Sequence, residues 1–350
     1  MRRTTQTESI TQQVKARIDA PKKKKEEFVG NTDVMISTGS TLLNLAISGG
    51  RVRGGGIPGG IMVEIFGPSS TGKTVLLCEL AGYIQREGGE VMFHDPEARL
   101  DTNFAEIFEL DTGKMEYLTP DTVTEMFTET RKWIPDNGKI NGVIADSLAA
   151  LSTDLEMGED EGDKMGMRRA KEFSEGFRKT ARIITGTNII MACSNQLRET
   201  MNTFGPKFKS PGGEAIGYYS SLRLRTALIS KGAKLIRIEK YKGKEIKQQY
   251  GVQIDIEVFK SSVWVPNRTA PVTIDYAYGI DDIRENLKYL KKINGTSVYC
   301  IGETKLEKSL ADSINMVEAD GLVDDLREEV IDTWEEIEKL FKVERKPKKR

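Results

Sequence analysis

The stretch GPSSTGKT at residues 67–74 decides how the rest of this chain is interpreted. It follows the apolar run 61–66 and precedes the amphipathic stretch 75–84, so it joins a predicted strand to a predicted helix. Glycines in such a turn let successive backbone N–H groups point inward, beside the positive end of the new helix. The full GxxxxGK[ST] spacing in this context predicts a phosphate-binding loop, here called the P-loop, and a nucleoside triphosphate as its ligand.

Two side chains of the P-loop have specific predicted roles. Lys73 is placed to reach the β- and γ-phosphates, and the Thr74 hydroxyl is placed to bind Mg²⁺. The predicted nucleotide contacts are Gly67, Pro68, Ser69, Ser70, Thr71, Gly72, Lys73, Thr74 and Val75.

Length and composition limit the classes of protein to which this chain can belong. The chain has 350 residues, 30% of them charged, and a net charge of −1, so any nucleic-acid surface must come from local segregation of charge. Three widely separated cysteines predict no disulfide scaffold. The single histidine, His94, excludes His-clustered zinc sites and a Ser-His-Asp triad. No segment approaches about 18 uninterrupted apolar residues, so we expect a soluble, cytoplasmic protein without a membrane segment.

Strands and helices alternate along the middle of the chain. Beyond the P-loop, strands are expected near 91–93, 115–118, 142–146 and 188–194, and helices near 74–86, 102–109, 121–134 and 167–185. This order predicts an α/β fold with a mainly parallel sheet covered by helices on both faces. After residue 220 the runs SLRLR, KLIRIEK, VQIDIEVF and VTIDY predict antiparallel strands that extend the sheet.

Changes of composition divide the chain into three predicted parts. Residues 1–33 form a basic N-terminal segment and oligomerisation arm, whose KKKK run is either a solvated linker or a binding patch. Residues 34–281 form the core. Residues 282–350 form a C-terminal region, with an acidic amphipathic helix over 318–341 followed by a basic tail. The apolar face of this helix is expected to hold Leu326, Val330, Trp334, Ile337 and Phe341.

Acidic side chains follow two of the predicted strands. GVIADS at 142–147 ends a strand with Asp146, which is well placed to hold Mg²⁺ together with Thr74. FHDPEARLD at 93–101 also ends a strand with acids. Phosphoryl transfer to water needs a group that orients or deprotonates the water, so we predict Glu97 in this role, with Asp95 as the second candidate. From its local sequence alone, this stretch also fits an exposed turn of charges.

Seven segments together resemble, in order and spacing, the RecA family of DNA recombinases. They are ISTGS (36–40), MVEIFGPSSTGKT, FHDPEARLD, GVIADSLAAL, GDKMGMRRAKEFS, ACSNQLR and PGGEAIGYYSSLRLR, and the resemblance covers roughly residues 33–281. It is greatest to the bacterial and phage branch. The resemblance implies a RecA-like P-loop ATPase core, with ATP and Mg²⁺ as cofactors.

The resemblance also implies roles for individual residues. Glu97 matches the acid that activates water, and Asp101 and Phe104 match the positions that contact and stack on adenine. Gln196 matches the residue that senses the γ-phosphate and transmits its presence to a DNA-binding loop, whereas by itself it reads as a buried polar cap on a strand end. The predicted catalytic set is thus Glu97, Lys73 and Gln196.

Two segments are predicted to hold DNA. The first, near 156–167, precedes a helix with a basic stripe opposite its apolar face, a pattern found in solvated faces as well as in DNA sites. The second, near 197–213, has little periodicity and is too long for an ordinary connector, so it is either a DNA-binding loop or a substrate lid. The predicted DNA contacts are Arg168, Arg169, Lys171, Arg178, Arg198, Met201, Phe204, Lys207, Phe208, Lys209, Gly212 and Gly213.

One position departs from the family pattern. The family places two lysines in a KxK arrangement near the ATP of the neighbouring subunit, and this chain has Lys260 but Ser262 at the second place. Arg268 is a candidate source of the missing charge.

We therefore expect an ATP-dependent homologous recombinase that forms helical filaments on single-stranded DNA, pairs it with homologous duplex DNA, and hydrolyses ATP when DNA is bound. A hexameric RecA-fold motor and a non-motor ATP-binding recombination mediator are the alternatives. A single-strand-binding protein and a loader are accessory partners that the sequence leaves open.

Overall fold

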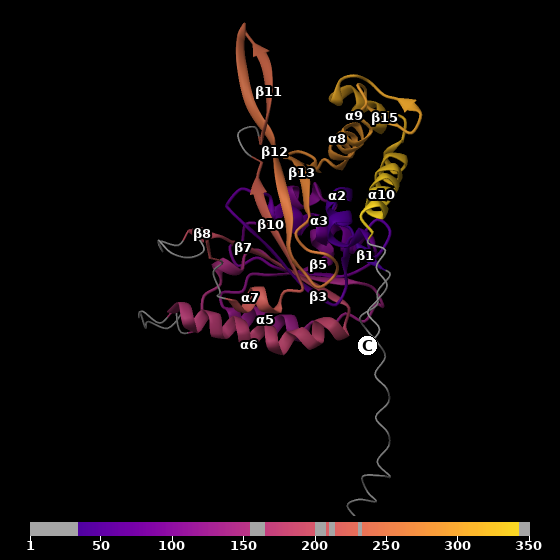
Figure 1. The fold of residues 1–350 in the computed structure, drawn as a ribbon. Coiled ribbons are helices and arrows are strands. Elements are labelled where there is room, and N and C mark those ends of the chain that lie inside the picture. The colour runs from indigo at the N-terminus through magenta and orange to yellow at the C-terminus, as the bar shows by residue number, and fades with distance from the viewer. Residues whose placement is uncertain (1–33, 155–164, 200–207, 210–213, 230–232, 343–350) are drawn as a thin grey trace, which may run out of the picture. The chain divides into compact units, whose positions relative to one another are not determined.

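Buried apolar strands build the centre of the protein, which we describe from a computed structural model of residues 34–154, 165–199, 208–209, 214–229 and 233–342. These residues belong to one compact unit spanning 32–350. Within them, ten strands form one sheet in the order β14-β13-β12-β10-β3-β7-β6-β4-β5, and β11 pairs with β12 off this path. Figure 1 shows the sheet with helices on both of its faces.

The strands of the sheet are short except for β12, which runs far beyond its neighbours. They are β3 (Ile61–Gly67), β4 (Val91–His94), β5 (Met115–Leu118), β6 (Asn141–Ala145), β7 (Ile189–Gln196), β10 (Leu222–Leu228), β11 (Lys234–Tyr241), β12 (Lys244–Ser261), β13 (Thr269–Asp275) and β14 (Gly279–Ile280). The small pairs are β1 (Met35–Ile36) with β2 (Ile57–Pro58), β8 (Arg198–Glu199) with β9 (Phe208–Lys209), and β15 (Cys300–Ile301) with β16 (Thr304–Lys305).

The helices follow the predicted alternation with strands. They are α2 (Thr41–Asn44), α3 (Lys73–Arg86), α4 (Thr102–Glu106), α5 (Val123–Lys132), α6 (Met165–Gly186), α7 (Glu214–Tyr219), α8 (Asp282–Asn294), α9 (Leu310–Ala319) and α10 (Val323–Leu340), with short helical turns η1 (Leu45–Gly49), η2 (Thr112–Lys114) and η3 (Leu148–Ala150). Among the described residues, no helix is long and apolar enough to cross a membrane.

Alternating side chains divide the core into two layers, one on each face of the sheet. On β6, Ile144 packs on the face covered by α3, whereas Val143 and Ala145 pack on the face covered by α5, α6 and α7. Figure 1 shows these three helices together on one side of the sheet. The predicted α/β core, with a mainly parallel sheet flanked by helices, is confirmed.

The strands after residue 220 differ from the prediction in one respect. β10 was expected to run antiparallel, but it pairs in parallel with β3, and the antiparallel part of the sheet begins at the pair of β10 with β12. β11 does extend the structure antiparallel, but it pairs with β12 alone, as a hairpin that rises from the sheet in Figure 1. The direction of a strand relative to its neighbours depends on the strands with which it pairs. Local hydrophobic periodicity does not specify those partners.

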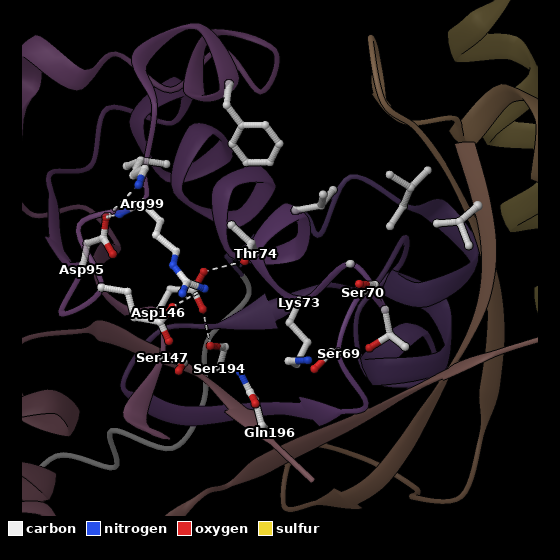
Figure 2. Close-up of a pocket in the computed structure, with 18 of the residues that line it drawn as sticks. Ser69, Ser70, Lys73, Thr74, Asp95, Arg99, Asp146, Ser147, Ser194 and Gln196 are labelled. Carbon is white, nitrogen blue, oxygen red and sulfur yellow. Dashed lines mark hydrogen bonds and ion pairs between the residues drawn. The ribbon is translucent and has the colours of Figure 1, made fainter. Parts of the chain in front are cut away.

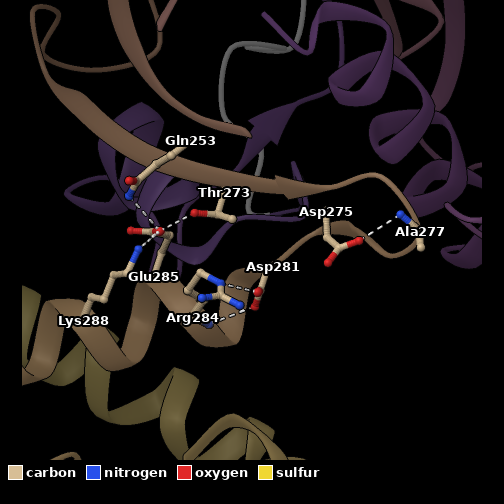
Figure 3. Close-up of polar contacts among 8 residues, drawn as sticks. All are labelled: Gln253, Thr273, Asp275, Ala277, Asp281, Arg284, Glu285 and Lys288. Carbon is tan, nitrogen blue, oxygen red and sulfur yellow. Dashed lines mark hydrogen bonds and ion pairs between the residues drawn. The ribbon is translucent and has the colours of Figure 1, made fainter. Parts of the chain in front are cut away.

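The region after residue 282 packs directly on the core. Glu285 on α8 is 3% exposed, and its carboxylate accepts hydrogen bonds from Thr273 Oγ1 of β13 (2.5 Å) and Gln253 Nε2 of β12 (3.1 Å). Lys288 Nζ, one turn further along α8, lies 2.9 Å from the same carboxylate and compensates its buried charge (Figure 3).

The expected acidic helix over 318–341 is divided in two. Helix α9 ends at Ala319 and α10 begins at Val323, because Gly321 takes a left-handed conformation (φ 68°) that ends the first helix. Leu326 and Val330 are buried as their spacing predicts, but Phe341 lies past the end of α10 and is exposed, so its predicted place on the apolar face is wrong.

Arg268 joins α10 to the core. Its two terminal nitrogens donate to both carboxylate oxygens of Glu338 on α10 (2.8 and 2.6 Å), and its guanidinium lies 4.1 Å from the Trp264 ring centroid and 5.4 Å from that of Trp334. Arg268 is thus engaged in packing the C-terminal helix within its own chain, and its suggested part in the ATP site of a neighbouring subunit stays a prediction.

Replacing Arg268 with alanine should lower the free energy of unfolding by roughly 1–2 kcal/mol, because a bidentate ion pair and two ring contacts are lost together. Urea unfolding measures this loss, and limited proteolysis should show α10 cut first. Arg327→Ala is the control. Arg327 Nη1 lies 3.3 Å from Oδ1 of the highly exposed Asp324 on the same helix, and such a surface ion pair contributes little to stability. Equal effects of the two substitutions would contradict the role of Arg268.

Glu79 on α3 is a buried acid that makes stability depend on pH. Its Oε1 accepts the backbone N–H of Ile280 at 3.0 Å, and a Cβ at Gly39 would lie 2.9 Å from its Oε2. Burial raises the pKa of Glu79 from 4.5 to about 7. The unfolded chain therefore loses this proton near pH 4.5 while the folded chain keeps it until about pH 7, so stability falls as the pH rises between these values.

Glu79→Gln should raise the free energy of unfolding by about 3 kcal/mol at pH 8 and by much less at pH 5, because burial of the neutral amide requires no desolvation of a charge. Urea unfolding at both pH values measures the difference. Glu116→Gln, at an exposed position on β5, should change neither value. An unchanged pH dependence in Glu79→Gln would show that another group causes it.

Candidate functional site

Four parallel strands end at one edge of the sheet and bring the predicted nucleotide-binding residues together. The P-loop follows β3, the 95–101 turn follows β4, Asp146 follows β6, and Gln196 ends β7. Because these strands pair in parallel, their carboxyl ends share one edge. A cavity of about 640 Å³ lies there, lined by residues from all four segments (Figure 2).

Lys73 sits in the floor of this cavity with its ammonium directed at the P-loop. Gly72, which precedes it, has a left-handed φ of 73°, so the loop turns sharply into α3 and a side chain there would meet Ile274. Lys73 Nζ donates to the carbonyl oxygens of Pro68 (2.7 Å) and Gly67 (3.2 Å). Burial lowers the pKa of Lys73, and the charge of Asp146 opposes that shift.

Thr74 and Asp146 form a hydroxyl–carboxylate pair. Thr74 Oγ1 donates to Asp146 Oδ2 at 2.6 Å, and Ser194 Oγ donates to Asp146 Oδ1 (Figure 2). One carboxylate and one hydroxyl fit Mg²⁺, which commonly takes one or two protein oxygens and completes its shell with water and phosphate oxygens. No cluster of three or more His, Cys, Asp or Glu side chains that could hold a metal ion occurs in the described parts of the chain.

The two acids of the 93–101 stretch have different surroundings. Asp95 is 2% exposed, and its Oδ2 accepts the backbone N–H groups of Arg99 and Leu100 (both 2.7 Å) and the hydroxyl of Tyr117 (2.9 Å). Asp95 therefore holds the turn that carries Glu97. All three of these hydrogen bonds are accepted by Oδ2, and the choice of Glu97 over Asp95 as the base stays a prediction.

Glu97 faces the cavity and has a partner that the sequence did not suggest. Arg99 Nη1 lies 2.5 Å from Glu97 Oε2, and both side chains line the cavity. The Glu97 side chain is 23% exposed, so its carboxylate can reach water without being fully solvated. As a catalytic base Glu97 remains a prediction, and its place beside the P-loop is the geometry that this role requires.

Gln196 lies beside the P-loop, where β7 pairs with β3 and Gly67 is opposite Gln196. Its side chain lines the cavity, whereas the preceding Asn195 turns inward and donates to buried Glu64 at 3.1 Å. The next residue, Leu197, donates its backbone N–H to Gly67 O at 3.3 Å, and the same carbonyl accepts from Lys73. The beginning of the 197–213 segment is thus bonded to the loop that holds Lys73.

The residues expected near adenine lie at the side of the cavity formed by α4. Phe104 lines the cavity and makes an edge contact with Phe108, with ring centroids 5.0 Å apart. Asp101 is the N-cap of α4, accepts the backbone N–H of Phe104 at 3.2 Å, and does not line the cavity. Asp101 therefore has a capping role, and its contact with adenine stays a prediction.

Most of the predicted nucleotide-binding residues meet in the cavity. Those that line it are Ser69, Ser70, Thr71, Gly72, Lys73, Thr74, Val75, Asp95, Glu97, Phe104, Asp146 and Gln196, and Ser147 beside Asp146 lines it too. Gly67, Pro68, Asp101 and Lys260 do not. The lining residues that we did not predict are Phe93, Arg99, Leu100, Ser194, Val252, Ile274 and Tyr276. Arg99 and Ser194 lie inside the motif segments, but the sequence does not show that their side chains point into the cavity.

The basic stripe on α6 is present, with one exception among its predicted DNA contacts. Arg168, Lys171 and Arg178 are exposed, opposite the buried apolar face of the helix. Arg169 is only partly exposed, and its Nη2 donates to the carbonyl oxygens of Leu148 and Ala149 (3.2 and 2.6 Å). Arg169 therefore joins α6 to η3, a structural role that leaves its DNA contact untested.

The remaining predicted DNA contacts fall in the second segment. Met201, Phe204, Lys207, Gly212 and Gly213 lie outside the described residues, as does most of the first segment near 156–167. For Arg198, Phe208 and Lys209 the structure describes the backbone, in which β8 and β9 pair antiparallel.

Lys260 lies on β12, away from the cavity of its own chain. Its Nζ donates to the carbonyl oxygens of Gly217 (2.8 Å) and Tyr218 (3.1 Å), near the C-terminus of α7. Ser262, at the place of the expected second lysine, donates its backbone N–H to Ser221 O at 2.7 Å. A contact of Lys260 with a nucleotide would therefore need a neighbouring subunit.

Comparison with known proteins identifies the family. The RecA N-terminal domain family model matches residues 22–281. Protein RecA of Acholeplasma laidlawii (strain PG-8A) is 31% identical over 280 residues, covering 77% of this chain and 78% of the relative. Protein RecA of Borrelia hermsii (strain HS1 / DAH) is 31% identical over 286 residues, covering 80% and 76%. Protein RecA of Clostridium botulinum (strain Alaska E43 / Type E3) is 35% identical over 259 residues, covering 73% and 67%. With its motifs, its sheet and these relatives in agreement, the chain belongs to the RecA family of DNA recombinases.

Proposed function

We propose that this chain is an ATP-dependent homologous DNA recombinase, which forms helical filaments on single-stranded DNA, pairs that DNA with a homologous duplex and exchanges strands. The observation that carries the proposal is the convergence of Lys73, Thr74, Glu97, Asp146 and Gln196 on one cavity. A phosphate-binding loop alone serves many unrelated machines. Glu97 as a base, and Gln196 as a γ-phosphate sensor that leads directly into the 197–213 segment, distinguish this site from those of other P-loop proteins.

ATP hydrolysis would proceed by attack of water on the γ-phosphorus. Glu97 takes the proton from the water, the bond between the γ-phosphorus and the bridging oxygen breaks, and ADP and phosphate leave. Lys73 neutralises charge on the β- and γ-phosphates, and Thr74 and Asp146 would hold Mg²⁺. When bound, the metal supplies further positive charge to the phosphates.

DNA binding would be coupled to the nucleotide through the carbonyl oxygen of Gly67. This oxygen accepts from both Lys73 Nζ and the backbone N–H of Leu197. A γ-phosphate that draws Lys73 toward itself weakens one of these two bonds, while Gln196 reaches the same phosphate from the strand end. The bond between Leu197 and Gly67 then changes with the nucleotide, so the affinity of the protein for DNA follows the nucleotide state.

The proposal predicts that single-stranded DNA stimulates ATP hydrolysis. Steady-state hydrolysis is measured with and without single-stranded DNA, and electron microscopy of the same mixtures distinguishes filaments from rings. Stimulation together with filaments supports the recombinase. Rings that move along DNA would favour a hexameric motor instead, and DNA binding with neither hydrolysis nor filaments would favour a recombination mediator.

A further inference from the structure

Arg99 places a guanidinium inside the nucleotide cavity. Its backbone N–H is held by Asp95 Oδ2 at 2.7 Å, which fixes the turn, while its side chain leaves the turn and projects into the cavity (Figure 2). Its Nη1 lies 2.5 Å from Glu97 Oε2, and its side chain is 78% exposed. The backbone of this arginine is therefore fixed, and its charged end is accessible to a ligand.

The charges that line the cavity make this guanidinium significant. Among its described lining residues, Lys73 and Arg99 are the cations, against the three carboxylates of Asp95, Glu97 and Asp146. Lys73 Nζ is already bonded to two P-loop carbonyl oxygens. A triphosphate that enters the cavity adds several negative charges, so Arg99 is the second source of positive charge that the chain itself provides.

The pairing with Glu97 is of a kind that a phosphate can displace. An ion pair with a largely exposed arginine contributes little to stability, because water screens it. A guanidinium binds phosphate oxygens in the same forked geometry as carboxylate oxygens, and the phosphate carries more charge. Transfer of Arg99 from Glu97 to a terminal phosphate is therefore favourable, and it leaves the Glu97 carboxylate able to accept a proton.

We propose that Arg99 contacts the γ-phosphate of ATP bound in its own subunit and, by leaving Glu97, releases the catalytic base only when a triphosphate is present. This inference rests on the proposed hydrolysis of ATP. It assigns to Arg99 two effects, recognition of the third phosphate and stabilisation of the charge that develops on it.

Nucleotide binding by the full chain tests the contact without any turnover. The affinities for the slowly hydrolysed β,γ-imido analogue of ATP and for ADP, both with Mg²⁺, are measured by calorimetry for wild type, Arg99→Ala and Arg99→Lys. Arg99→Ala should weaken binding of the analogue by about tenfold and change ADP binding less than about twofold, with Arg99→Lys intermediate. Equal weakening of both ligands, or of neither, would overturn the contact with the γ-phosphate.

A matched control uses an arginine outside the cavity. Arg86 on α3 also pairs with a glutamate, Glu109, and its side chain is 44% exposed, so Arg86→Ala removes a comparable ion pair. It should leave both affinities unchanged. The assignment to Arg99 would be overturned if Arg86→Ala changed the ratio of the affinities for the analogue and for ADP as much as Arg99→Ala does.

Hydrolysis by the same variants distinguishes contact with phosphate from mere positioning of Glu97. Arg99→Ala should lower kcat by about 100-fold, with partial recovery in Arg99→Lys. A lower kcat with an unchanged analogue-to-ADP ratio would mean that Arg99 only positions Glu97, against the proposal. The proposed function fails if wild type binds no ATP, or if Lys73→Ala binds ATP as tightly as wild type does. If wild type binds ATP, Lys73→Ala does not, and Arg99→Ala behaves as wild type, the inference about Arg99 alone fails.

Discussion

Lys73→Ala should bind ATP at least about 100-fold more weakly than wild type and hydrolyse it at background rate, the largest effect that we expect from any single substitution. The ammonium group is held at the P-loop by two carbonyl oxygens, and no other cation among the described lining residues lies in that loop. Without it, the phosphates meet carbonyl oxygens with no opposing charge. Calorimetric titration with ATP and a phosphate-release assay measure the two losses.

The control for Lys73 is a lysine with no role in the cavity. Lys114 is exposed on η2 and pairs with Asp111 at 2.8 Å, so Lys114→Ala removes one positive charge without touching the P-loop. It should bind and hydrolyse ATP as wild type does. Circular dichroism of both variants checks that neither substitution unfolds the protein. Normal ATP affinity in Lys73→Ala would refute the nucleotide site itself.

Glu97→Gln should retain ATP binding and lose hydrolysis by roughly 100- to 10,000-fold, the range of a general base. The amide has nearly the same shape as the carboxylate but cannot accept the proton from water. Filaments on single-stranded DNA should then persist, because the triphosphate state is no longer consumed. A single-turnover hydrolysis assay and filament lifetimes after dilution measure these effects.

Asp95 supplies the comparison for Glu97, because the two acids belong to one turn and differ in their contacts. Asp95→Asn removes the charge that accepts two backbone N–H groups and the Tyr117 hydroxyl, so it should lower stability in urea and reduce ATP binding. Glu97→Gln should leave stability nearly unchanged, since its pairing with Arg99 is exposed on one side. Hydrolysis by Glu97→Gln at the wild-type rate would show that our assignment is wrong, and Asp95 would become the candidate base.

The nucleotide side of the site could be predicted because its signals are local. The P-loop spacing indicates where β3 ends and α3 begins, Asp146 directly follows the buried strand β6, and Glu97 lies in the turn after β4. Parallel pairing then brings these strand ends together. Residue type and position relative to a strand end were sufficient to predict the P-loop and Asp146, whereas Gln196 was singled out by the resemblance to the RecA family.

Features that depend on distant parts of the chain were missed. The direction of β10 is decided by its pairing with β3, which lies some 160 residues earlier, as the partners Leu222 and Val63 show. The role of Arg268 is decided by Glu338, 70 residues later, because only the folded chain brings α10 against Trp264. Local hydrophobic periodicity contains neither kind of information.

Arg99 was missed for a different reason. It lies in the motif segment 93–101, two residues after Glu97. A charged residue in a turn is not part of a periodic pattern, so the sequence does not show where its side chain points. In the folded chain the Asp95 carboxylate holds the backbone of this turn, and the Arg99 side chain enters the cavity beside Glu97. Side-chain direction in turns therefore required the structure.

ATP-dependent strand exchange between homologous DNAs tests the central claim most directly. Circular single-stranded DNA and linear duplex DNA of the same sequence are incubated with the protein and ATP, and the joint and product molecules are separated by electrophoresis. We predict products with ATP and a homologous duplex, and none with ADP, with an unrelated duplex or with Lys73→Ala. Absence of products from wild type under conditions where it binds single-stranded DNA and hydrolyses ATP would contradict the account.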